Sequence, residues 1–153
     1  KNVFDKITGF NPKYFPGEDP DLFIRAKKNN FRIAYSPHIK IYHKRRPTFS
    51  SFVKQIYSYG KVRPKIAKNS SISVFIIPSL FILYLGTLPL LIFINTLFII
   101  PLLLYAAIAV LFSLFDALKN KKLMSLPFLP FFYLTMHIAY GIGFIVGLLE
   151  KTN

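Results

Sequence analysis

The chain has 153 residues, with 20 Lys and Arg against six Asp and Glu, and 53% of its residues are hydrophobic. It contains no cysteine, which excludes a disulfide framework, a Cys-based zinc site and a thiol nucleophile. No charged residue occurs from Asn69 to Phe115, a run of 47 residues. One membrane-spanning helix needs roughly 20 residues. We therefore expect a basic domain followed by a membrane domain.

The segment up to Lys68 carries 16 Lys and Arg but four acidic residues. The chain begins with Lys, and its first residues lack the regions of a signal peptide, so we expect the C-terminal part of a longer protein. Three of the four acids, Glu18, Asp19 and Asp21, fall in one short stretch. This concentration makes the acidic turn the first candidate for a functional role.

A loop is expected before the acidic turn, because Gly, Asn and Pro between Gly9 and Pro12 end any helix. The loop continues to Gly17 with two aromatic residues, Tyr14 and Phe15. They either contact a substrate beside the acidic turn or cover the core.

The acidic turn itself favours a helix start at Asp19-Pro20. An Asp side chain accepts hydrogen bonds from the free N–H groups of a first turn, and Pro at the first helical position loses no bond. Asp21 precedes Arg25 by four residues, which allows an ion pair on the helix. A helix from this turn can therefore present Glu18 and Asp19 at its mouth.

The predicted helix ends near Lys28, with Asn29 or Asn30 in a left-handed conformation. Two short strands are then predicted at 31–35 and 39–43, the second from its period-two alternation. His43 is at the end of the second predicted strand, and the alternation places it on the same face as Ile39 and Ile41. His43 is a metal ligand or hydrogen-bond partner in one interpretation and a structural residue in the other.

Residues 48–62 are predicted to form an amphipathic helix. The apolar residues that share one helical face are Phe49, Phe52, Val53, Ile56 and Tyr57. A basic collar surrounds this helix, with Lys and Arg at 44–46 and again from 61 to 68. We expect the helix to lie in the headgroup layer, with its basic residues toward anionic lipids.

Three membrane helices are predicted at about 72–93, 96–117 and 126–149. The basic loop at 119–122 and the basic collar both belong on the cytoplasmic side by the distribution of Lys and Arg. Two crossings lie between them, and the third helix then exits, leaving 150–153 outside. This organisation describes an integral protein of the cell membrane with residues 1–68 in the cytoplasm.

The last predicted helix contains His137, together with Gly143 and Gly147, whose spacing suits close helix packing. A polar residue inside a membrane span is a functional candidate. A neighbouring helix can also satisfy a single His, and both interpretations remain open for His137.

Glu18 and Asp19 likewise have two interpretations. In one, Asp19 caps the helix and Glu18 is solvated. In the other, a carboxylate at the junction of loop and helix acts as general base, for which it must lie within hydrogen-bond reach of the proton it removes. The two roles are compatible.

An ordered series of motifs runs through nearly the whole chain. In order these are Gly9-Phe10, Glu18-Asp19-x-Asp21-Leu22-x-x-Arg25, Tyr35-x-Pro37, His43, Gln55-x-x-x-Tyr59-Gly60 and His137-x-x-Tyr140-Gly141-x-Gly143. The series resembles the C-terminal half of membrane-bound family-two glycosyltransferases, similar to succinoglycan-type polysaccharide biosynthesis transferases. The resemblance implies an α/β fold at 1–47, as part of a Rossmann-like GT-A catalytic domain. An interfacial helix and collar at 48–68 and an all-α transmembrane region at 69–153 would follow.

The resemblance implies an inverting transfer of sugar from a nucleotide-sugar donor at the cytoplasmic membrane face. Asp19 would deprotonate the acceptor hydroxyl, with Glu18 supporting it. Processive members carry Q-x-x-R-W, but this chain has Gln55 followed by Ser58 and Tyr59 at the Arg and Trp positions. The departure favours a single transfer to a lipid-linked or glycan acceptor.

Further roles follow from the resemblance. Gln55, Tyr59 and Tyr14 would contact the acceptor or product, and His43 and Arg46 would lie near the metal or diphosphate. Residues expected to hold the structure are Asp21, Arg25, Gly141, Gly143 and Gly147. A divalent metal, Mg or Mn, is expected, with its main ligands in an N-terminal half absent from this sequence, so the chain alone is not expected to turn over. Anionic lipids are expected partners; nucleic acid is not.

A competing hypothesis is a non-enzymatic membrane anchor or adaptor with a basic lipid-binding juxtamembrane domain. The net charge of 1–68, with 16 basic and four acidic residues, permits it. A transporter subunit would need more polar groups in the spans than Asn95 and His137 supply. An upstream Asp-x-Asp motif would favour the transferase over the adaptor.

Overall fold

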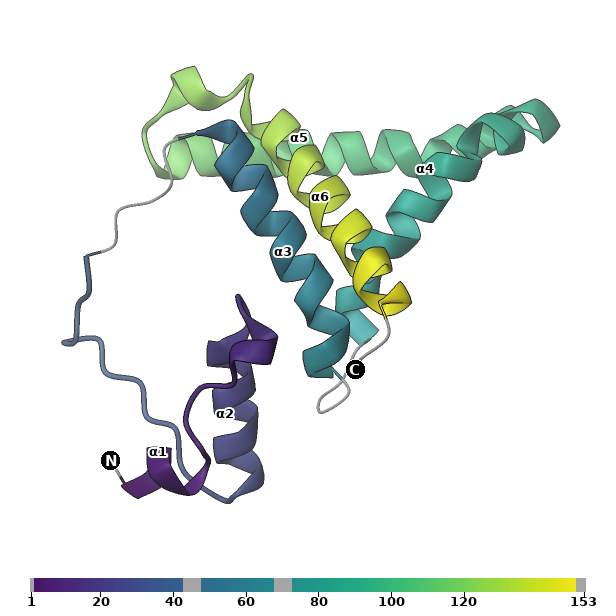
Figure 1. Cartoon of the computed structure of the whole chain (residues 1–153). Coiled ribbons are helices and arrows are strands. Elements are labelled where there is room, and N and C mark those ends of the chain that lie inside the picture. The colour runs from purple at the N-terminus through teal and green to yellow at the C-terminus, as the bar shows by residue number, and fades with distance from the viewer. Residues whose placement is uncertain (1, 43–47, 68–72, 151–153) are drawn as a thin grey trace.

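The computed structural model describes residues 2–42, 48–67 and 73–150 (Figure 1). The helices in these ranges are α1 (Asn2–Lys6), α2 (Glu18–Lys28), α3 (Phe49–Ala67), α4 (Ile77–Ile94), α5 (Ile100–Lys119) and α6 (Leu129–Leu149). Short 3-10 helices are η1 (Pro12–Tyr14), η2 (Ser73–Ile76), η3 (Thr96–Ile99) and η4 (Leu123–Ser125). Element η1 contacts both α2 and α3. Helix α6 is the common partner of the long helices, because α3, α4 and α5 all pack on it.

The described ranges are 77% helical and contain no strand, so this part of the chain is all-α. The prediction of an α/β, Rossmann-like GT-A domain is therefore wrong. Residues 31–42 are extended or turn-like and, apart from the half-buried Phe31, exposed, with Tyr35 89% and Tyr42 97% accessible. A strand needs a neighbouring strand to complete its hydrogen bonds, and no segment in the described ranges pairs with this one. His43, the last residue of the second predicted strand, lies outside the described residues.

Helix α2 begins earlier than predicted. Its N-cap is Gly17, and no side chain caps its first turn, so the prediction that Asp19 is the cap is wrong. Asp19 instead occupies the second helical position and Pro20 the third, where a proline still lacks only an N–H that has no partner within the helix. The predicted end at Lys28 is confirmed, and Asn30 follows with φ 59°, the left-handed conformation expected there.

Arg25 connects α2 to the preceding loop. Its Nε lies 2.8 Å from Oδ2 of Asp21, which confirms the predicted ion pair. Its other nitrogens donate to the backbone oxygens of Gly9, at 2.6 Å, and Ile7. The Asp21 residue is 1% exposed, so a buried carboxylate, a guanidinium and two carbonyls together fix α2 against the chain that precedes it.

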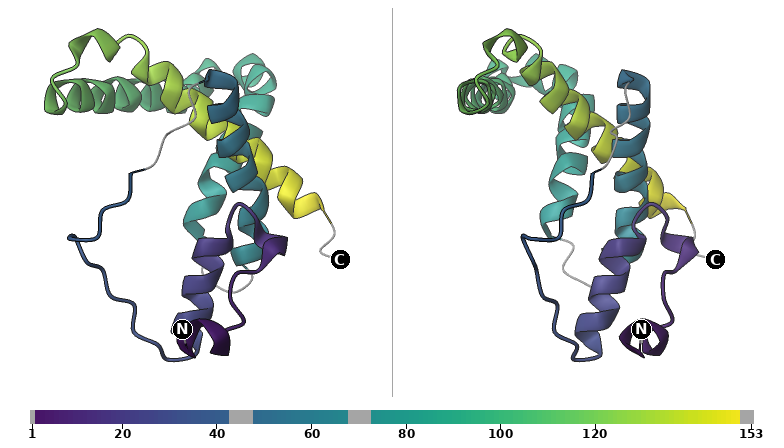
Figure 2. Two further views of the ribbon diagram at one scale, coloured as in Figure 1. Left: turned by 60° about the vertical axis from the view of Figure 1, so that its left-hand side comes forward. Right: turned by 90° about the vertical axis from the view of Figure 1, so that its left-hand side faces the viewer.

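Helices α3 and α6 run in the same direction, side by side (Figures 1 and 2). At their first turns, the rings of Phe49 and Phe131 are stacked, with centroids 5.6 Å apart. At their far ends, Nζ of Lys65 lies 3.2 Å from Oε2 of Glu150. Between these points Gly60, Gly143 and Gly147 bring the two backbones together; a Cβ on Gly147 would lie 2.8 Å from the carbonyl carbon of Lys61.

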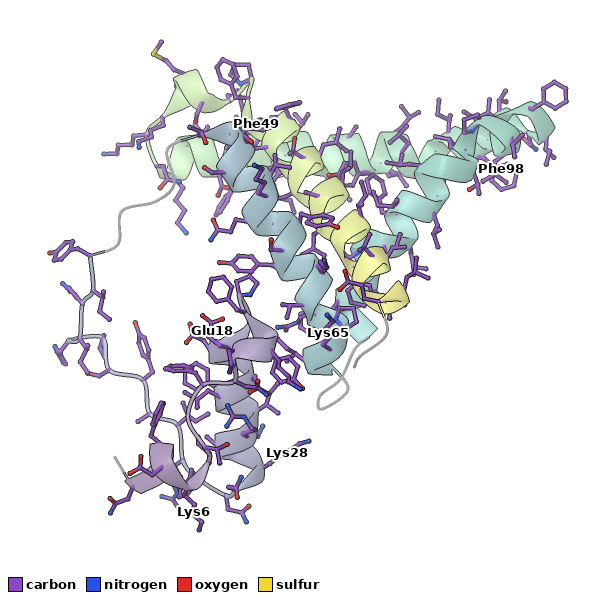
Figure 3. All side chains as sticks on the ribbon, in the orientation of Figure 1. Lys6, Glu18, Lys28, Phe49, Lys65 and Phe98 are labelled. Atoms are coloured by element: carbon purple, nitrogen blue, oxygen red, sulfur yellow. The ribbon has the colours of Figure 1, made fainter. Side chains whose placement is uncertain are left out.

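Helices α4 and α5 form a hairpin whose two arms rest on α6 (Figure 1). The first turn of α4 lies against Gly141, where a Cβ would be 2.9 Å from the carbonyl carbon of Pro78. The last turns of α5 reach Tyr133, whose hydroxyl donates to Asp116. The arms meet at Phe98, well away from α3 and α6, as Figure 3 shows.

Among the described residues, three helical segments are long and apolar enough to cross a membrane: Ile77–Ile94, Thr96–Lys119 and Leu129–Leu149. They match the predicted spans at 72–93, 96–117 and 126–149 to within a few residues. The molecule therefore has the composition of a membrane protein. The predicted amphipathic helix also forms, and it extends beyond residue 62 to Ala67.

Candidate functional site

Two cavities meet at the start of α2. The first, which we call the polar cavity, has a volume of about 620 Å³ and lies between the loop before α2, α3 and the end of α6. Its side chains are largely charged or hydrogen-bonding, and include Lys13, Glu18, Asp19, Gln55, Tyr59 and Lys65. Glu18 and Asp19 of the acidic turn thus face the same space as the Gln-x-x-x-Tyr motif, which begins at Gln55, 36 residues after Asp19.

The second, which we call the apolar cavity, has a volume of about 550 Å³. Apolar and aromatic side chains from α3, η2, α4 and α6 line it, among them Ile56, Ile66, Phe75, Met136 and Tyr140. Asp19 and Tyr59 line both cavities. They mark the boundary at which a charged compartment gives way to one surrounded by the apolar helices.

Packing of Gly17 on α3 sets the position of Asp19. A Cβ on Gly17 would lie 2.9 Å from Cγ1 of Val62 and would also contact Ile66, so the N-cap of α2 rests directly on α3. Asp19 follows two residues later, and its side chain is exposed. The first turn of a helix carries partial positive charge, so an acidic residue such as Asp19 interacts favourably with the helix dipole there.

Glu18 presents a buried oxygen to this region. Among the described residues, its Oε2 has no hydrogen-bond partner. A buried carboxylate oxygen without a donor is unfavourable, so such an atom is suited to accept a hydrogen bond from water or from a bound hydroxyl. Glu18 as a residue also lines the polar cavity beside Asp19.

The Gln55 amide donates to the hydroxyl of Tyr59 at 2.7 Å, one helical turn away on α3. This bond holds Tyr59 at the boundary between the two cavities. Tyr14 lies in η1 and lines neither of them, whereas its neighbours Lys13 and Phe15 line the polar cavity. The expected contact of Tyr14 with an acceptor stays a prediction.

Glu150 pairs with two cations across the polar cavity. Its carboxylate lies 2.6 Å from Nζ of Lys61 and 3.2 Å from Nζ of Lys65. The hydrogen bond and charge of Glu150 raise the pKa of Lys61, and hydrogen bonds from the two lysines lower the pKa of Glu150. Sequence reasoning missed Glu150, because no local pattern links it to lysines that lie 85 or more residues earlier.

The apolar cavity holds two further polar groups. The guanidinium of Arg63 stacks 3.6 Å from the centroid of the Phe75 ring, a cation–π contact at the cavity wall. Nδ1 of His137 lies 2.8 Å from the carbonyl oxygen of Tyr133 and 3.1 Å from the hydroxyl of Tyr105 on α5. Of the two interpretations of His137, partnership with a neighbouring helix is the one that these contacts support.

The residues with expected structural roles lie at helix contacts. Asp21 and Arg25 pair within α2, Gly141 meets α4, and Gly143 and Gly147 meet α3. His43 and Arg46 lie outside the described residues. In the described ranges, no group of three His, Cys, Asp or Glu side chains could hold a metal ion. The Mg or Mn expected from the resemblance therefore stays a prediction, and no step below depends on it.

Comparisons with protein-family models, with curated proteins and with solved structures found no significant match to this chain. The resemblance to family-two glycosyltransferases is thus carried by the motifs alone. Function has to be argued from the two cavities and the residues between them.

Proposed function

We propose that this chain supplies the acceptor side of an inverting glycosyltransferase, which moves a sugar from a nucleotide-sugar donor to a lipid-linked or glycan acceptor at the membrane surface. The observation that carries the proposal is the position of Asp19, an exposed carboxylate on the boundary of the polar and apolar cavities. The proposal requires no α/β domain within this chain.

The pair of cavities supports an amphiphilic acceptor in particular. An acceptor anchored in lipid has an apolar chain and a polar head, and each half matches one cavity. The junction between the halves would lie at Asp19 and Tyr59. There a hydroxyl of the acceptor comes within hydrogen-bond reach of a carboxylate, which is the geometric requirement for a general base.

Cations around the site support a phosphorylated ligand. Lys13, Lys61 and Lys65 line the polar cavity, and Arg63 lines the apolar one. Clustered positive charge attracts phosphates of a donor or of a lipid headgroup. Glu150 offsets part of the charge of Lys61 and Lys65, which leaves Arg63 and Lys13 as the cations free of this ion pair.

In the proposed reaction, Asp19 accepts the proton of the acceptor hydroxyl. The oxygen forms a bond to the anomeric carbon of the donor sugar while the bond from that carbon to the nucleotide phosphate breaks on the opposite face. The nucleotide leaves with the electrons of that bond, and the configuration inverts. Glu18, with its unpaired Oε2, would accept a second hydrogen bond from the acceptor and hold it in place.

The test uses the full-length protein in membranes with a panel of radiolabelled nucleotide sugars. We expect one donor to be consumed with label appearing in the lipid or glycan fraction, and Asp19→Asn to abolish transfer while donor binding persists. Asp5→Asn is the matched control, because Asp5 is exposed on α1 and lines neither cavity. Normal turnover by Asp19→Asn would refute the base.

The second candidate, a lipid-binding membrane anchor or adaptor, rests on the same cations. Lys13, Lys61 and Arg63 suit anionic headgroups without any reaction. The panel separates the two functions: consumption of no donor, combined with binding to vesicles that contain anionic lipid, favours the adaptor.

A further inference from the structure

Helices α3 and α6 stay in contact from their first turns to their last. The Phe49 ring stacks on Phe131 at one end, and Lys65 pairs with Glu150 at the other. Contacts of Gly60, Gly143 and Gly147 with the opposite backbone leave no room for lipid between them. Whatever depth α3 takes in a membrane, α6 takes a similar one.

Helix α3 carries a polar face along its whole length, which is unsuited to the hydrocarbon core of a bilayer. The residues on this face are Ser51, Lys54, Gln55, Ser58, Lys61 and Lys65. Lys54 is exposed in the second turn of α3, so a crossing by the pair would place its charge inside the hydrocarbon layer. Apart from Arg63, mainly apolar residues occupy the other face of α3, the pattern of a helix that lies in the membrane interface.

The far end of α3 is also tied to the part of the chain outside the membrane helices. Val62 and Ile66 pack against Gly17, directly before α2. The start of α2 carries Glu18, Asp19 and Asp21, which belong in water or a polar site. Because Glu150 at the end of α6 pairs with Lys61 and Lys65, that end lies beside α2 as well.

The α4–α5 hairpin has the opposite character. Large apolar side chains are exposed along both arms, including Leu83, Leu90, Leu104, Leu111 and Phe112. Of the most apolar 18-residue stretch of α6, 28% is buried inside the protein, against 11% of the corresponding stretch in each arm of the hairpin. The α6 segment also has the lowest hydropathy of the three. The arms return to α6 at Gly141 and Tyr133, so the hairpin leaves and rejoins the same helix.

We infer that α6 does not cross the bilayer. The α3–α6 pair lies along one membrane surface with lipid headgroups as its partner, and the α4–α5 hairpin enters the bilayer from that surface. The loop at 119–122 and the end of α6 are then on the same side as the basic collar. This arrangement replaces the exit of the third helix expected from the sequence, and it does not rest on the proposed function.

Labelling of single cysteines tests this arrangement, since the chain has no native cysteine. Lys27→Cys, Lys121→Cys and Leu149→Cys all change exposed residues, in α2, in the basic loop and at the end of α6. Each full-length variant is reacted with a membrane-impermeant maleimide in vesicles of both orientations. We expect all three to react in the same orientation; reaction of Leu149→Cys in the orientation opposite to Lys121→Cys would overturn the inference.

A depth measurement gives an independent readout. A spin label at Ile142 on α6 is compared with one at Leu104 on α5, both at exposed positions within their helices. Ile142 borders a groove that also contains Lys54, so we expect a water-soluble relaxation agent to reach it several times more effectively than Leu104. Equal protection of the two labels contradicts the surface position.

A fluorescent protein fused directly after residue 153 reports on which side of the membrane the end of α6 lies, without a substitution in that helix. Added protease should digest the fluorescent protein in vesicles of the orientation in which Lys27→Cys reacts with the maleimide. Protection of the fusion in those vesicles, with digestion in the others, would overturn the inference.

Discussion

Gly143 of α6 lies against the backbone of Tyr57 of α3, so closely that a Cβ at position 143 would be 3.0 Å from the Tyr57 carbonyl carbon. The contact is between two backbones, and neither can move aside as a flexible side chain would. It is one of three such glycine contacts that join α3 to α6.

Gly143→Ala is therefore expected to destabilise the α3–α6 pair. Overpacking of a close contact typically costs about 1–3 kcal/mol. Gly86→Ala in α4 is the matched control, because a Cβ there meets nothing within 4 Å. Unfolding in detergent, followed by circular dichroism, measures the difference. Equal stability of the two variants would show that the helices do not meet at Gly143.

Arg25→Ala should loosen α2 from the loop before it. The substitution removes the partner of Asp21, which is 1% exposed, and the donors to the carbonyl oxygens of Ile7 and Gly9. Loss of one member of a buried ion pair costs about 3–5 kcal/mol. Since the Arg25 side chain is 23% exposed, the lower part of that range is expected.

Hydrogen exchange over residues 2–30 measures this effect, because local opening exposes backbone amides. Lys27→Ala, at an exposed position of the same helix, is the control. Faster exchange in Arg25→Ala alone is expected, and unchanged exchange would contradict the role of Arg25 as the link.

The contact of Glu150 with Lys61 and Lys65 should be sensitive to acid. The pKa of Glu150 is lowered in the folded chain, mainly by the hydrogen bond from Lys61. A carboxylate of this kind stabilises the fold above its unfolded pKa, about 4.3, and loses that contribution as pH falls through its lower, folded pKa. The loss therefore begins near pH 5 and grows on further acidification.

Glu150→Gln should be less stable than the native protein at pH 7 and approach it as the pH falls from about 5 to below the folded pKa. Detergent unfolding at a series of pH values gives this comparison. A constant difference between the two proteins over the same range would exclude a role for the Glu150 charge.

Arg63→Gln should weaken use of a phosphorylated lipid acceptor in the proposed reaction. The guanidinium lines the apolar cavity and stacks on Phe75, whereas Lys54, on the same helix, lines neither the polar nor the apolar cavity. Loss of a charge-assisted hydrogen bond to phosphate corresponds to about a tenfold rise in the acceptor KM. Acceptor titrations of Arg63→Gln and Lys54→Gln measure this, and equal effects of the two substitutions would contradict a specific contact.

The helices were predictable because a helix completes its hydrogen bonds within its own sequence. A helix was expected from Asp19-Pro20 to about Lys28 and forms at 18–28, and the apolar periodicity from 48 to 62 marked α3. The predicted strands at 31–35 and 39–43 depended on partners elsewhere, and alternation of apolar residues carries no information on whether a partner strand exists. The segment 31–42 shows the pattern of a strand and remains unpaired in the described ranges.

The candidate site was predictable only in part. Glu18, Asp19, Gln55 and Tyr59 could be selected as chemically suitable residues. Their convergence on one cavity depends on Gly17 packing against α3, a tertiary contact without a local signal. The apolar cavity adds residues from η2, α4 and α6, whose side chains resemble ordinary apolar packing when read in sequence.

The turn between α4 and α5 bears on how the chain reaches its membrane. Oδ1 of Asn95 accepts from the backbone N–H of Leu97 at 2.8 Å, and Tyr84 donates to the carbonyl oxygen of Phe98 at 2.8 Å. These four polar groups at the tip are thus satisfied by neighbours, and no charged residue occurs from Asn69 to Phe115. Insertion of this hairpin from one side carries no ionised group through the hydrocarbon, so no hydrophilic segment has to be translocated during biogenesis.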